Sequence, residues 1–301
     1  GPWDERFICE LMLRDRFSQW MHRLTMWPRW LLMSVRGRSR LLEERGAPLQ
    51  LPAVRRQVDR QPGLISIAVC TYNRCESLRD TLAGLRNQIL RDGLSLEILI
   101  VDNNSTDRTQ QVVEEAAQES RWPIRYLFEP RQGKSFAGNM AIREARGEIL
   151  AMTDDDAIPE STWAQALHEA FVSLQADCVG GMVLPFWLAP PPGWLLRRDV
   201  RETLWTKLAL LDRGREPVVA DGRNSAFIFG DNMAFRTEAL VELGCFRTDL
   251  GPKGTFVMKC EDTEILERFF AASKRVVYAP RAIVYHKVPP QRMRMNYFRQ
   301  W

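Results

Sequence analysis

The sequence predicts an α/β fold of the Rossmann-like kind, in which helices flank a mostly parallel, mixed sheet and a helical extension precedes it. Short apolar runs rich in β-branched residues alternate with segments of helical length between residues 64 and 154, and this alternation is typical of βαβ units. Hydrophobic residues make up 45% of the 301 residues and charged residues 27%. That composition is ordinary for a globular protein and supplies a sizeable core.

The strands and helices of the first half follow one another regularly. Each strand is a buried apolar run, and the four runs are LISIAVC (64–70), LEILIVD (96–102), IRYLFE (124–129) and EILAMTD (148–154). The connecting helices are expected at 77–88, 106–119 and 135–146. Strands joined by crossover helices run parallel, so their carboxyl ends meet at one edge of the sheet.

The order is less regular after Pro159. We expect a helix at 161–174, a strand at 178–187, a proline-rich loop at 188–199, strand character at 227–236, a helix at 260–273 and strand character at 276–288. The main domain is therefore predicted at 63–290, between an amphipathic helical extension with its linker at 1–62 and a basic tail at 291–301.

The N-terminal extension is the basic part of the chain. Residues 1–61 hold 12 Arg and 7 acidic residues, a net charge of +5, so the remainder carries −1 to give the total of +4. Large apolar residues recur there at helical spacing, and Pro28 divides the run into two predicted helices. Peripheral contact with an anionic membrane through 1–45, a homo-oligomer interface and packing across the main domain all stay open.

Cysteine usage and hydropathy indicate the cellular compartment of the protein and the classes of partner that it is expected to bind. The six cysteines are scattered without a CxxC pair, which argues against a zinc ribbon and fits a reducing compartment. No run of 18 uncharged apolar residues and no secretory signal is visible. We expect a cytoplasmic protein, with peripheral attachment to the inner face of the membrane left open. Without a lysine-rich stripe, nucleic acid is not an expected partner.

Polar residues follow three of the predicted strands at the point where each strand ends. They are Thr71-Tyr72-Asn73-Arg74 after the first strand, Asp102-Asn103-Asn104-Ser105 after the second and Asp154-Asp155-Asp156 after the fourth. Ligands of open α/β sheets bind at this edge. We therefore expect the three clusters to converge on one crevice.

The three adjacent aspartates indicate a metal site. Carboxylates this close repel one another and need a counter-ion, and Mg²⁺ and Mn²⁺ prefer oxygen ligands. Side chains at i and i+2 of an extended strand end point the same way, which places Asp154 and Asp156 together. The alternative is a solvated acidic turn that caps the helix beginning near Ser161. The apolar strand that runs into the cluster favours the metal.

These pieces resemble the inverting glycosyltransferases of family 2, which have the GT-A fold. The matching segments are AVCTYNR (68–74), ILIVDNNSTDRT (98–109), GKSFAGNMAIREARGEILAMTDDD (133–156), GDNMAFR (230–236) and CEDTEILERF (260–269). The resemblance spans about residues 64–290 and is specific for the family, but not for the substrate. It implies a metal-bound nucleoside diphosphate sugar, with a UDP-sugar expected, and direct displacement at the anomeric carbon.

The resemblance also assigns the nucleoside end of the donor site. Thr71, Tyr72 and Arg74 match the segment that holds the nucleoside, with a strand-end turn as the alternative role. Asp102 matches the carboxylate that accepts a hydrogen bond from the base, with an Asx-turn or helix cap as the alternative.

The phosphate and metal end follows in the same way. Arg131 and Lys134 lie in EPRQGKS, where the family places a basic residue near the phosphates, and exposed salt bridges are the alternative for both. Asp154, Asp155 and Asp156 match the metal motif for Mn²⁺ or Mg²⁺, and Asp154 is also assigned to the donor. Which of the three ligates stays open. His286 in YHKV is similar to a late histidine that some relatives place on the metal, and a structural role is its alternative.

The resemblance places the chemistry on a later segment. Glu261 and Asp262 match the family's Glu-Asp pair, in which the Asp takes the proton of the acceptor hydroxyl. A favourable charge at a helix N-terminus is the alternative for both. Asp231 matches a loop near the acceptor and is assigned to donor sugar or acceptor, with a turn role as its alternative.

The predicted function is therefore an inverting glycosyltransferase that moves a sugar from a nucleoside diphosphate sugar to a glycan or other hydroxyl acceptor. Polysaccharide or glycoconjugate synthesis is the expected setting. A metal-dependent nucleotidyltransferase is the first alternative, although TYNRCES is not the Gly-rich basic loop that such an enzyme needs after its first strand. A non-catalytic nucleotide-sugar-binding module is the second, and it would not need Glu261 and Asp262.

Overall fold

The computed structural model describes residues 59–222, 228–253, 256–258 and 260–299. The chain divides into two compact units, whose described parts are 59–186 with 209–288, and 187–208 with 289–299. The predicted extension at 1–62, including the proposed membrane segment at 1–45, lies almost wholly outside the described residues. No helix among the described residues is long and apolar enough to cross a membrane.

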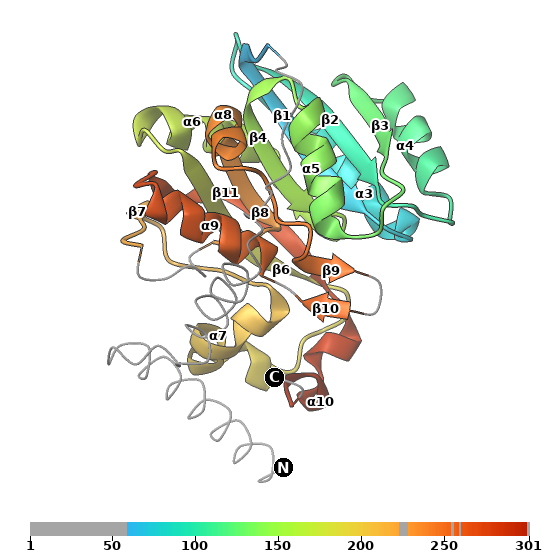
Figure 1. The fold of residues 1–301 in the computed structure, drawn as a ribbon. Coiled ribbons are helices and arrows are strands. Elements are labelled where there is room, and N and C mark those ends of the chain that lie inside the picture. Colours follow the sequence, from blue (N-terminus) through green and yellow to red (C-terminus); the bar gives the residue numbers. More distant parts are fainter. Residues whose placement is uncertain (1–58, 223–227, 254–255, 259, 300–301) are drawn as a thin grey trace, which may run out of the picture. The chain divides into compact units, whose positions relative to one another are not determined.

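The first half of the larger unit is a parallel sheet with connecting helices, as predicted (Figure 1). The strands β1, β2, β3 and β4 are Gln61–Thr71, Ser95–Asp102, Ile124–Phe128 and Gly147–Asp154. The helices α3, α4 and α5 are Cys75–Arg86, Thr109–Gln118 and Lys134–Glu144. The strands lie in the order β3-β2-β1-β4 and are all parallel.

The second half of the larger unit continues this sheet through a strand that is antiparallel to β4. Its strands β5, β6, β7, β8 and β11 are Ala157–Pro159, Cys178–Trp187, Val218–Val219, Asn232–Arg236 and Val276–Val288. Its helices α6, α8 and α9 are Trp163–Ser173, Thr237–Glu242 and Glu261–Ala271. Beyond β4 the order is β8-β6-β11-β5, with β7 paired to β11. A separate hairpin is formed by β9, Gly251–Lys253, and β10, Phe256–Met258. The sheet is therefore mixed, and β1–β4 form a continuous parallel part.

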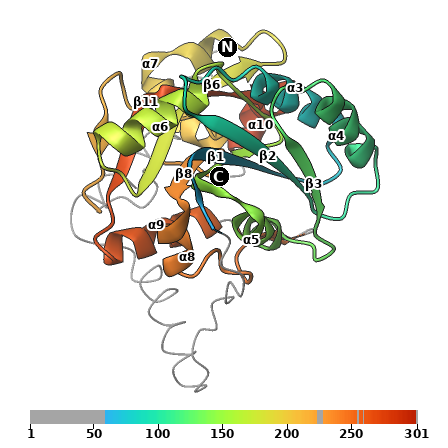
Figure 2. The same ribbon diagram turned by 90° about the horizontal axis from the view of Figure 1, so that it is seen from above.

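The core lies on both faces of the central strands. Ile65, Ile67 and Val69 of β1 are fully buried, as are the apolar residues at 98–101 of β2, because helices cover both faces of the parallel part. In Figure 2, α3, α4 and α6 lie on one side of the sheet and α5, α8 and α9 on the other. Because helices cover both faces of the described parallel part, a ligand of these strands is expected at their ends.

The helix starts differ from the sequence prediction because one aspartate caps two helices. Asp107 accepts hydrogen bonds from the backbone N–H of Cys75 (3.0 Å) and from the N–H and hydroxyl of Thr109 (3.0 and 2.5 Å). Side-chain oxygens that bond the exposed N–H groups of a helix end fix where it begins. The first helix accordingly starts at 75 rather than 77, and the second at 109 rather than 106.

The smaller unit corrects the prediction of a proline-rich loop at 188–199. The 3₁₀ helix η1 spans Gly193–Leu196, the helix α7 spans Arg198–Leu204 and the 3₁₀ helix η2 spans Trp205–Leu208. Trp205 donates its indole N–H to the carbonyl of Leu195 at 3.1 Å, which ties these turns together. The predicted tail at 291–301 is also helical in part, with η3 at Pro290–Met293 and α10 at Met295–Phe298.

Candidate active site

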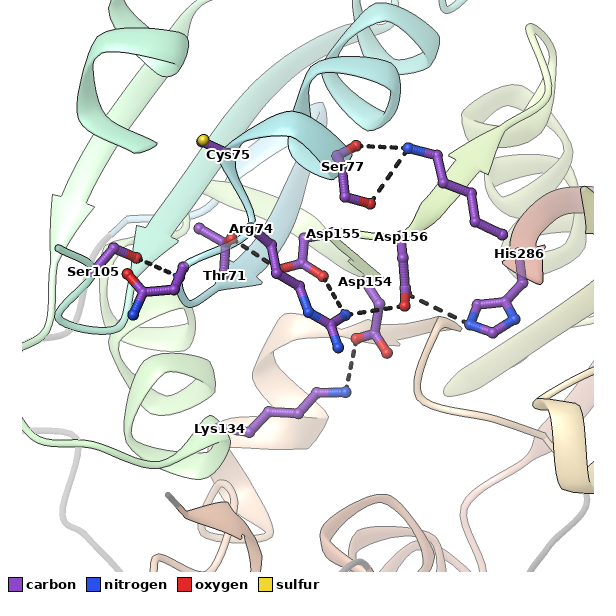
Figure 3. Close-up of polar contacts among 12 residues, drawn as sticks. Thr71, Arg74, Cys75, Ser77, Ser105, Lys134, Asp154, Asp155, Asp156 and His286 are labelled. Atoms are coloured by element: carbon purple, nitrogen blue, oxygen red, sulfur yellow. Dashed lines mark hydrogen bonds and ion pairs between the residues drawn. The ribbon is translucent and has the colours of Figure 1, made fainter. Parts of the chain in front are cut away.

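The strand ends meet as the alternation of strands and helices predicts. Thr71 at the end of β1 is the register partner of Asp102 at the end of β2, and Cys70 is the partner of Asp154 at the end of β4. All three polar clusters therefore share one edge of the parallel part of the sheet (Figure 3). We call residues 154–156 the aspartate turn.

The aspartate turn is tied to the nucleoside segment at 71–74. The hydroxyl of Thr71 donates to Asp155 Oδ2 at 2.8 Å. Arg74 Nη1 lies 3.0 Å from Asp155 Oδ1 and 3.0 Å from Asp156 Oδ2, so one guanidinium bridges two carboxylates. Burial favours a lower pKa for Arg74, but Asp155 and Asp156 outweigh it and the pKa is raised.

Lys134 and His286 approach the same turn from other elements. Lys134 at the start of α5 places its Nζ 2.7 Å from Asp154 Oδ1 and 4.0 Å from Glu261 Oε1. His286 on β11 is buried, with its Nε2 3.5 Å from Asp156 Oδ1. Burial favours a lower pKa for Lys134, but the surrounding carboxylates, Asp154 first, hold it well above the usual value.

Acidic side chains outnumber basic ones in this cluster. Its carboxylates are Asp154, Asp155, Asp156, Asp231, Glu261 and Asp262, whereas its permanent cations are Arg74 and Lys134. Burial raises the pKa of Asp155 to about 6, although Arg74 opposes the shift. Burial also raises the pKa of Asp231 to about 7, although His286 opposes it. The cluster is therefore short of positive charge.

The chemistry of the carboxylates in this cluster suits a hard divalent cation. Both carboxylate oxygens of Asp231 are buried without a hydrogen-bond partner among the described residues, as is Glu261 Oε2. Hard cations take carboxylate oxygens of this kind. As the side chains lie, no three His, Cys, Asp or Glu residues in the described part of the chain are arranged to hold a metal ion. Arg74 and Lys134 occupy the aspartate turn instead, so a cation there would take over carboxylates that they now neutralise.

Glu261 and Asp262 begin the helix α9 beside two glycines. Asp262 Oδ1 accepts the backbone N–H of Thr263 at 2.8 Å. A Cβ built on Gly230 would lie 3.4 Å from Asp262 Oδ2, so the missing side chain leaves that carboxylate uncovered on one side. Gly251 has φ of +92°, and a Cβ there would lie 2.9 Å from Ser135 Oγ and 3.6 Å from Glu261 Oε2. Both carboxylates are thus approached closely by backbone that carries no side chain.

The predicted nucleoside residues separate into a buried and an exposed group. Asp102 is 2% exposed, and its Oδ1 accepts the N–H of Ser105 at 2.8 Å, which is the turn role that the sequence left open. Its Oδ2 accepts the hydroxyl of Tyr126 at 2.7 Å. Tyr72, which follows the register partner of Asp102 in the chain, is 46% exposed, so its ring is available to a ligand.

Arg131 does not join the cluster around the aspartate turn. Its Nε and Nη2 each lie 2.8 Å from an oxygen of Glu129, and its guanidinium sits 4.7 Å from the centre of the Phe136 ring. The salt bridge that the sequence left as an alternative is therefore formed. Arg131 would have to leave Glu129 to reach a phosphate.

Sequence reasoning missed the residues that connect the loops. Asn73 has φ of +51°, donates its N–H to Ser105 Oγ at 2.9 Å and accepts the N–H of Thr106 at 2.7 Å. Asn tolerates this left-handed conformation better than most residues, so an Asn after a strand was the available signal. Lys287 contacts both α3 and the aspartate turn. The sequence feature that could have identified it is a charged residue inside an apolar strand.

One known protein family matches the chain that carries this fold and site. The model of the family described as glycosyl transferase family 2 matches residues 66–244, more than half of the chain. The chain belongs to glycosyl transferase family 2. This glycosyltransferase carries its Glu261-Asp262 pair beyond the matched stretch.

Two curated relatives match most of the family 2 chain. The glucosyl-dolichyl phosphate glucuronosyltransferase of Haloferax volcanii is 25% identical over 228 residues, covering 74% of this chain and 69% of the relative. The succinoglycan biosynthesis protein ExoM of Rhizobium meliloti is 28% identical over 229 residues, covering 76% and 68%. The similarity to these two relatives thus covers about three quarters of the chain.

Solved structures share the GT-A fold with this glycosyltransferase. The mannosyltransferase PcManGT of Pyrobaculum calidifontis, solved with GDP-Man and Mn²⁺, has a TM-score of 0.56 at 22% identity and covers 94% of this chain and 69% of its own. TarS 1–349 of S. aureus with UDP has a TM-score of 0.55 at 18% identity and covers 75% of this chain. The match spans 61% of that TarS fragment and 36% of a longer TarS chain.

The buried position of Asp102 leads to a prediction about nucleotide binding. We expect Asp102→Ala to weaken UDP binding about tenfold to a hundredfold, because a charge-assisted hydrogen bond is worth about 1.5–3 kcal/mol. Isothermal calorimetry measures this change. Tyr126→Phe is the matched control, because it removes the Tyr126–Asp102 bond and keeps the carboxylate. Equal dissociation constants for Asp102→Ala and wild type would leave Asp102 with its turn role alone.

Proposed function

We propose that this family 2 enzyme is an inverting glycosyltransferase that moves a sugar from a UDP-sugar to an acceptor hydroxyl. The observation that carries the proposal is the meeting of the nucleoside segment, the aspartate turn and the Glu261-Asp262 pair at one cluster. A pyrophosphate, a sugar and an acceptor hydroxyl need these three kinds of partner side by side. Family membership favours this reaction over nucleotidyl transfer and over a non-catalytic binding module.

Asp262 is the proposed base. It lies at the N-terminus of α9, half-buried, next to the open side left by Gly230. A hydroxyl placed there could pass its proton to the carboxylate as the hydroxyl oxygen attacks the anomeric carbon from the face opposite the leaving phosphate. Glu261 is a poorer candidate, because it is buried 4.0 Å from Lys134. We assign Glu261 to orienting the donor sugar or the acceptor, together with Asp231.

Mn²⁺ or Mg²⁺ is the proposed cofactor, held by carboxylates of the aspartate turn with His286 and Asp231 close by. When bound, such an ion supplies charge stabilisation to the leaving pyrophosphate. The acidic excess of the cluster supports this assignment, as does the Mn²⁺ with which PcManGT was solved. Lys134 and Arg74 carry positive charge at the same edge, and we assign them to the phosphates. Thr71, Tyr72 and Asp102 would hold the nucleoside, while Arg131 would act only after leaving Glu129.

The acceptor is proposed to be a growing glycan or glycoconjugate. The names of the two curated relatives support this setting, since one acts on glucosyl-dolichyl phosphate and the other serves succinoglycan biosynthesis. A lipid-linked acceptor would bring a cytoplasmic enzyme to the inner face of the membrane. Peripheral membrane contact through 1–45 remains a proposal, and a homo-oligomer interface is the alternative proposal for this segment. Both concern residues outside the described part of the chain.

Nucleotide release tests the proposed reaction. The enzyme is incubated with Mn²⁺ and, separately, UDP-glucose, UDP-N-acetylglucosamine, UDP-glucuronic acid and GDP-mannose, and released nucleoside diphosphate is measured. We expect slow hydrolysis of at least one UDP-sugar, accelerated by the correct glycan acceptor. Binding of UDP without any turnover, with or without lipid-linked glycans, would favour a binding module instead.

The space beside Gly230 leads to a prediction about the acceptor. A Cβ there makes ordinary van der Waals contact with Asp262 at 3.4–3.8 Å, so Gly230→Ala should fold normally and cover the carboxylate. We expect kcat/KM for the acceptor to fall about tenfold to a hundredfold, because small misplacements at the reacting atoms are costly. UDP affinity should stay unchanged. Gly193→Ala is the control, because a Cβ there meets nothing within 4 Å. Equal loss in both variants would contradict the role of this space.

A further inference from the structure

One buried lysine contacts both halves of the proposed donor site. Lys287, near the end of β11, is 7% exposed. Its Nζ lies 2.6 Å from Asp80 Oδ2, 2.9 Å from the carbonyl of Ser77 and 3.3 Å from Ser77 Oγ, all on α3 (Figure 3 draws the two bonds at Ser77). Its backbone N–H donates to the carbonyl of Asp156 at 2.9 Å. A single residue therefore joins α3 to the aspartate turn.

This lysine is an unusual choice for a buried position. Taking an ammonium group out of water is unfavourable unless its donors are satisfied, and here two oxygens of Ser77 and one of Asp80 accept them. An apolar side chain of similar length would fill the same space without that cost. The charge is therefore better explained by what it holds in place than by packing.

Lys287 completes a closed ring of contacts. The helix α3 follows directly on the nucleoside segment at 71–74, and Arg74 bridges from that segment to Asp155 and Asp156. Lys287 closes the ring on the other side, from Asp156 back to Ser77. Besides the hydroxyl of Thr71, which donates to Asp155, two charged links thus join the nucleoside segment to the aspartate turn, one made by Arg74 and one by Lys287.

The two links differ in what a bound donor would do to them. The side chain of Arg74 is 48% exposed and its partners are carboxylates that we assign to the metal. A cation and a pyrophosphate at the aspartate turn would compete for both. Lys287 makes its bonds to a carbonyl, a hydroxyl and Asp80, outside that set. Of the two links, the lysine is the one that can stay the same with and without the donor.

We propose that Lys287 is a positioning residue that holds the nucleoside segment and the aspartate turn at a fixed separation, so that nucleoside and metal-bound pyrophosphate bind as one unit. This inference rests on the proposed function. It predicts that losing Lys287 uncouples metal binding from nucleotide binding, whereas a lysine that only stabilises the fold would leave the coupling intact.

The experiment measures that coupling without turnover. The dissociation constant of UDP is measured by calorimetry with and without Mn²⁺, and the ratio of the two values reports how strongly the metal helps the nucleotide. In Lys287→Met we expect the ratio to fall at least about tenfold, the change expected from losing one charge-assisted hydrogen bond. Lys274→Met is the matched control, because it removes an ion pair of 2.9 Å to Glu242 on the surface. Its ratio should equal that of the wild type.

Each result decides one point. An unchanged ratio in folded Lys287→Met overturns the positioning role and leaves the proposed function standing. A wild-type enzyme whose UDP affinity does not respond to Mn²⁺ overturns the metal-dependent function and this inference with it. If Lys287→Met does not fold, Asp80→Asn is tested instead. This change removes the charged partner of Lys287, and the side chain of Asp80 is 61% exposed. The ratio of the UDP dissociation constants without and with Mn²⁺ must then fall about twofold or more, a change within the range that exposed ion pairs contribute. A smaller fall would show that the proposal is wrong.

Discussion

Asp262→Asn is expected to stop sugar transfer while leaving the nucleotide bound. The amide keeps the size of the side chain and can still accept the N–H of Thr263, but it is not a base. General-base catalysis is worth about 100- to 10,000-fold, so the turnover number should fall by at least the lower figure. The dissociation constant of UDP with Mn²⁺ should barely change, because only the chemical step is damaged. Steady-state kinetics with saturating acceptor and calorimetry give the two values.

Glu261→Gln is the matched variant for this test. Glu261 is the neighbouring carboxylate, but it is buried and one of its oxygens faces Lys134 at 4.0 Å. We expect its replacement to alter the Michaelis constants more than the turnover number. Near-normal turnover in Asp262→Asn together with a collapse in Glu261→Gln would move the base to Glu261 and refute the assignment made from the family motif.

Removal of divalent metal is the second change with a large expected effect. The acidic excess of the cluster and the oxygens of Asp231, which have no hydrogen-bond partner among the described residues, lead us to expect that EDTA abolishes transfer and that Mn²⁺ or Mg²⁺ restores it. A bound metal supplies several kcal/mol of charge stabilisation, and each ~1.4 kcal/mol is tenfold in rate, so the loss should be on the order of 100-fold or more. Product formation with and without the chelator measures it.

The chelator test needs a control for non-specific effects. EDTA saturated beforehand with Mn²⁺ should leave the rate unchanged. Asp155→Asn and Asp156→Asn should each reduce the improvement in UDP affinity that Mn²⁺ brings, which separates them from Asp262→Asn. Full activity in excess EDTA would show that Arg74 and Lys134 suffice to neutralise the leaving pyrophosphate, and would refute the metal assignment.

The sequence was enough for the parallel part of the sheet and for the meeting of its strand ends. Apolar runs alternating with helices specify βαβ units, and the topology then brings Thr71, Asp102 and Asp154 to one edge. These positions follow from local pattern alone, because the strands that carry them, β1, β2 and β4, are largely buried on both faces. The second half of the sheet was harder, since its strands lack regular spacing along the chain.

Pairings between distant side chains could not be predicted. Nothing in the local sequence shows that Arg74 bridges Asp155 and Asp156, which lie 81 and 82 positions away in the chain. The proline-rich segment misled for a related reason. Proline disfavours the interior of a helix but is compatible with its start. The helix η1 begins directly after the prolines at 190–192, and α7 follows it from Arg198.

The division of the sheet has an evolutionary consequence. Its parallel strands lie within the stretch matched by the family model, apart from the first residues of β1, whereas the Glu261-Asp262 pair and β11 lie after residue 244, where that match ends. Under the proposed roles, the nucleoside residues and the base therefore lie in separate stretches of the gene, although His286 and Lys287 of β11 place part of the donor side in the later stretch. A lineage could alter the base region while inheriting the nucleoside residues unchanged. The join at β4 and β8, where Thr153 donates its hydroxyl to the carbonyl of Asp231 at 2.8 Å, is the natural place to splice chimeras of two relatives.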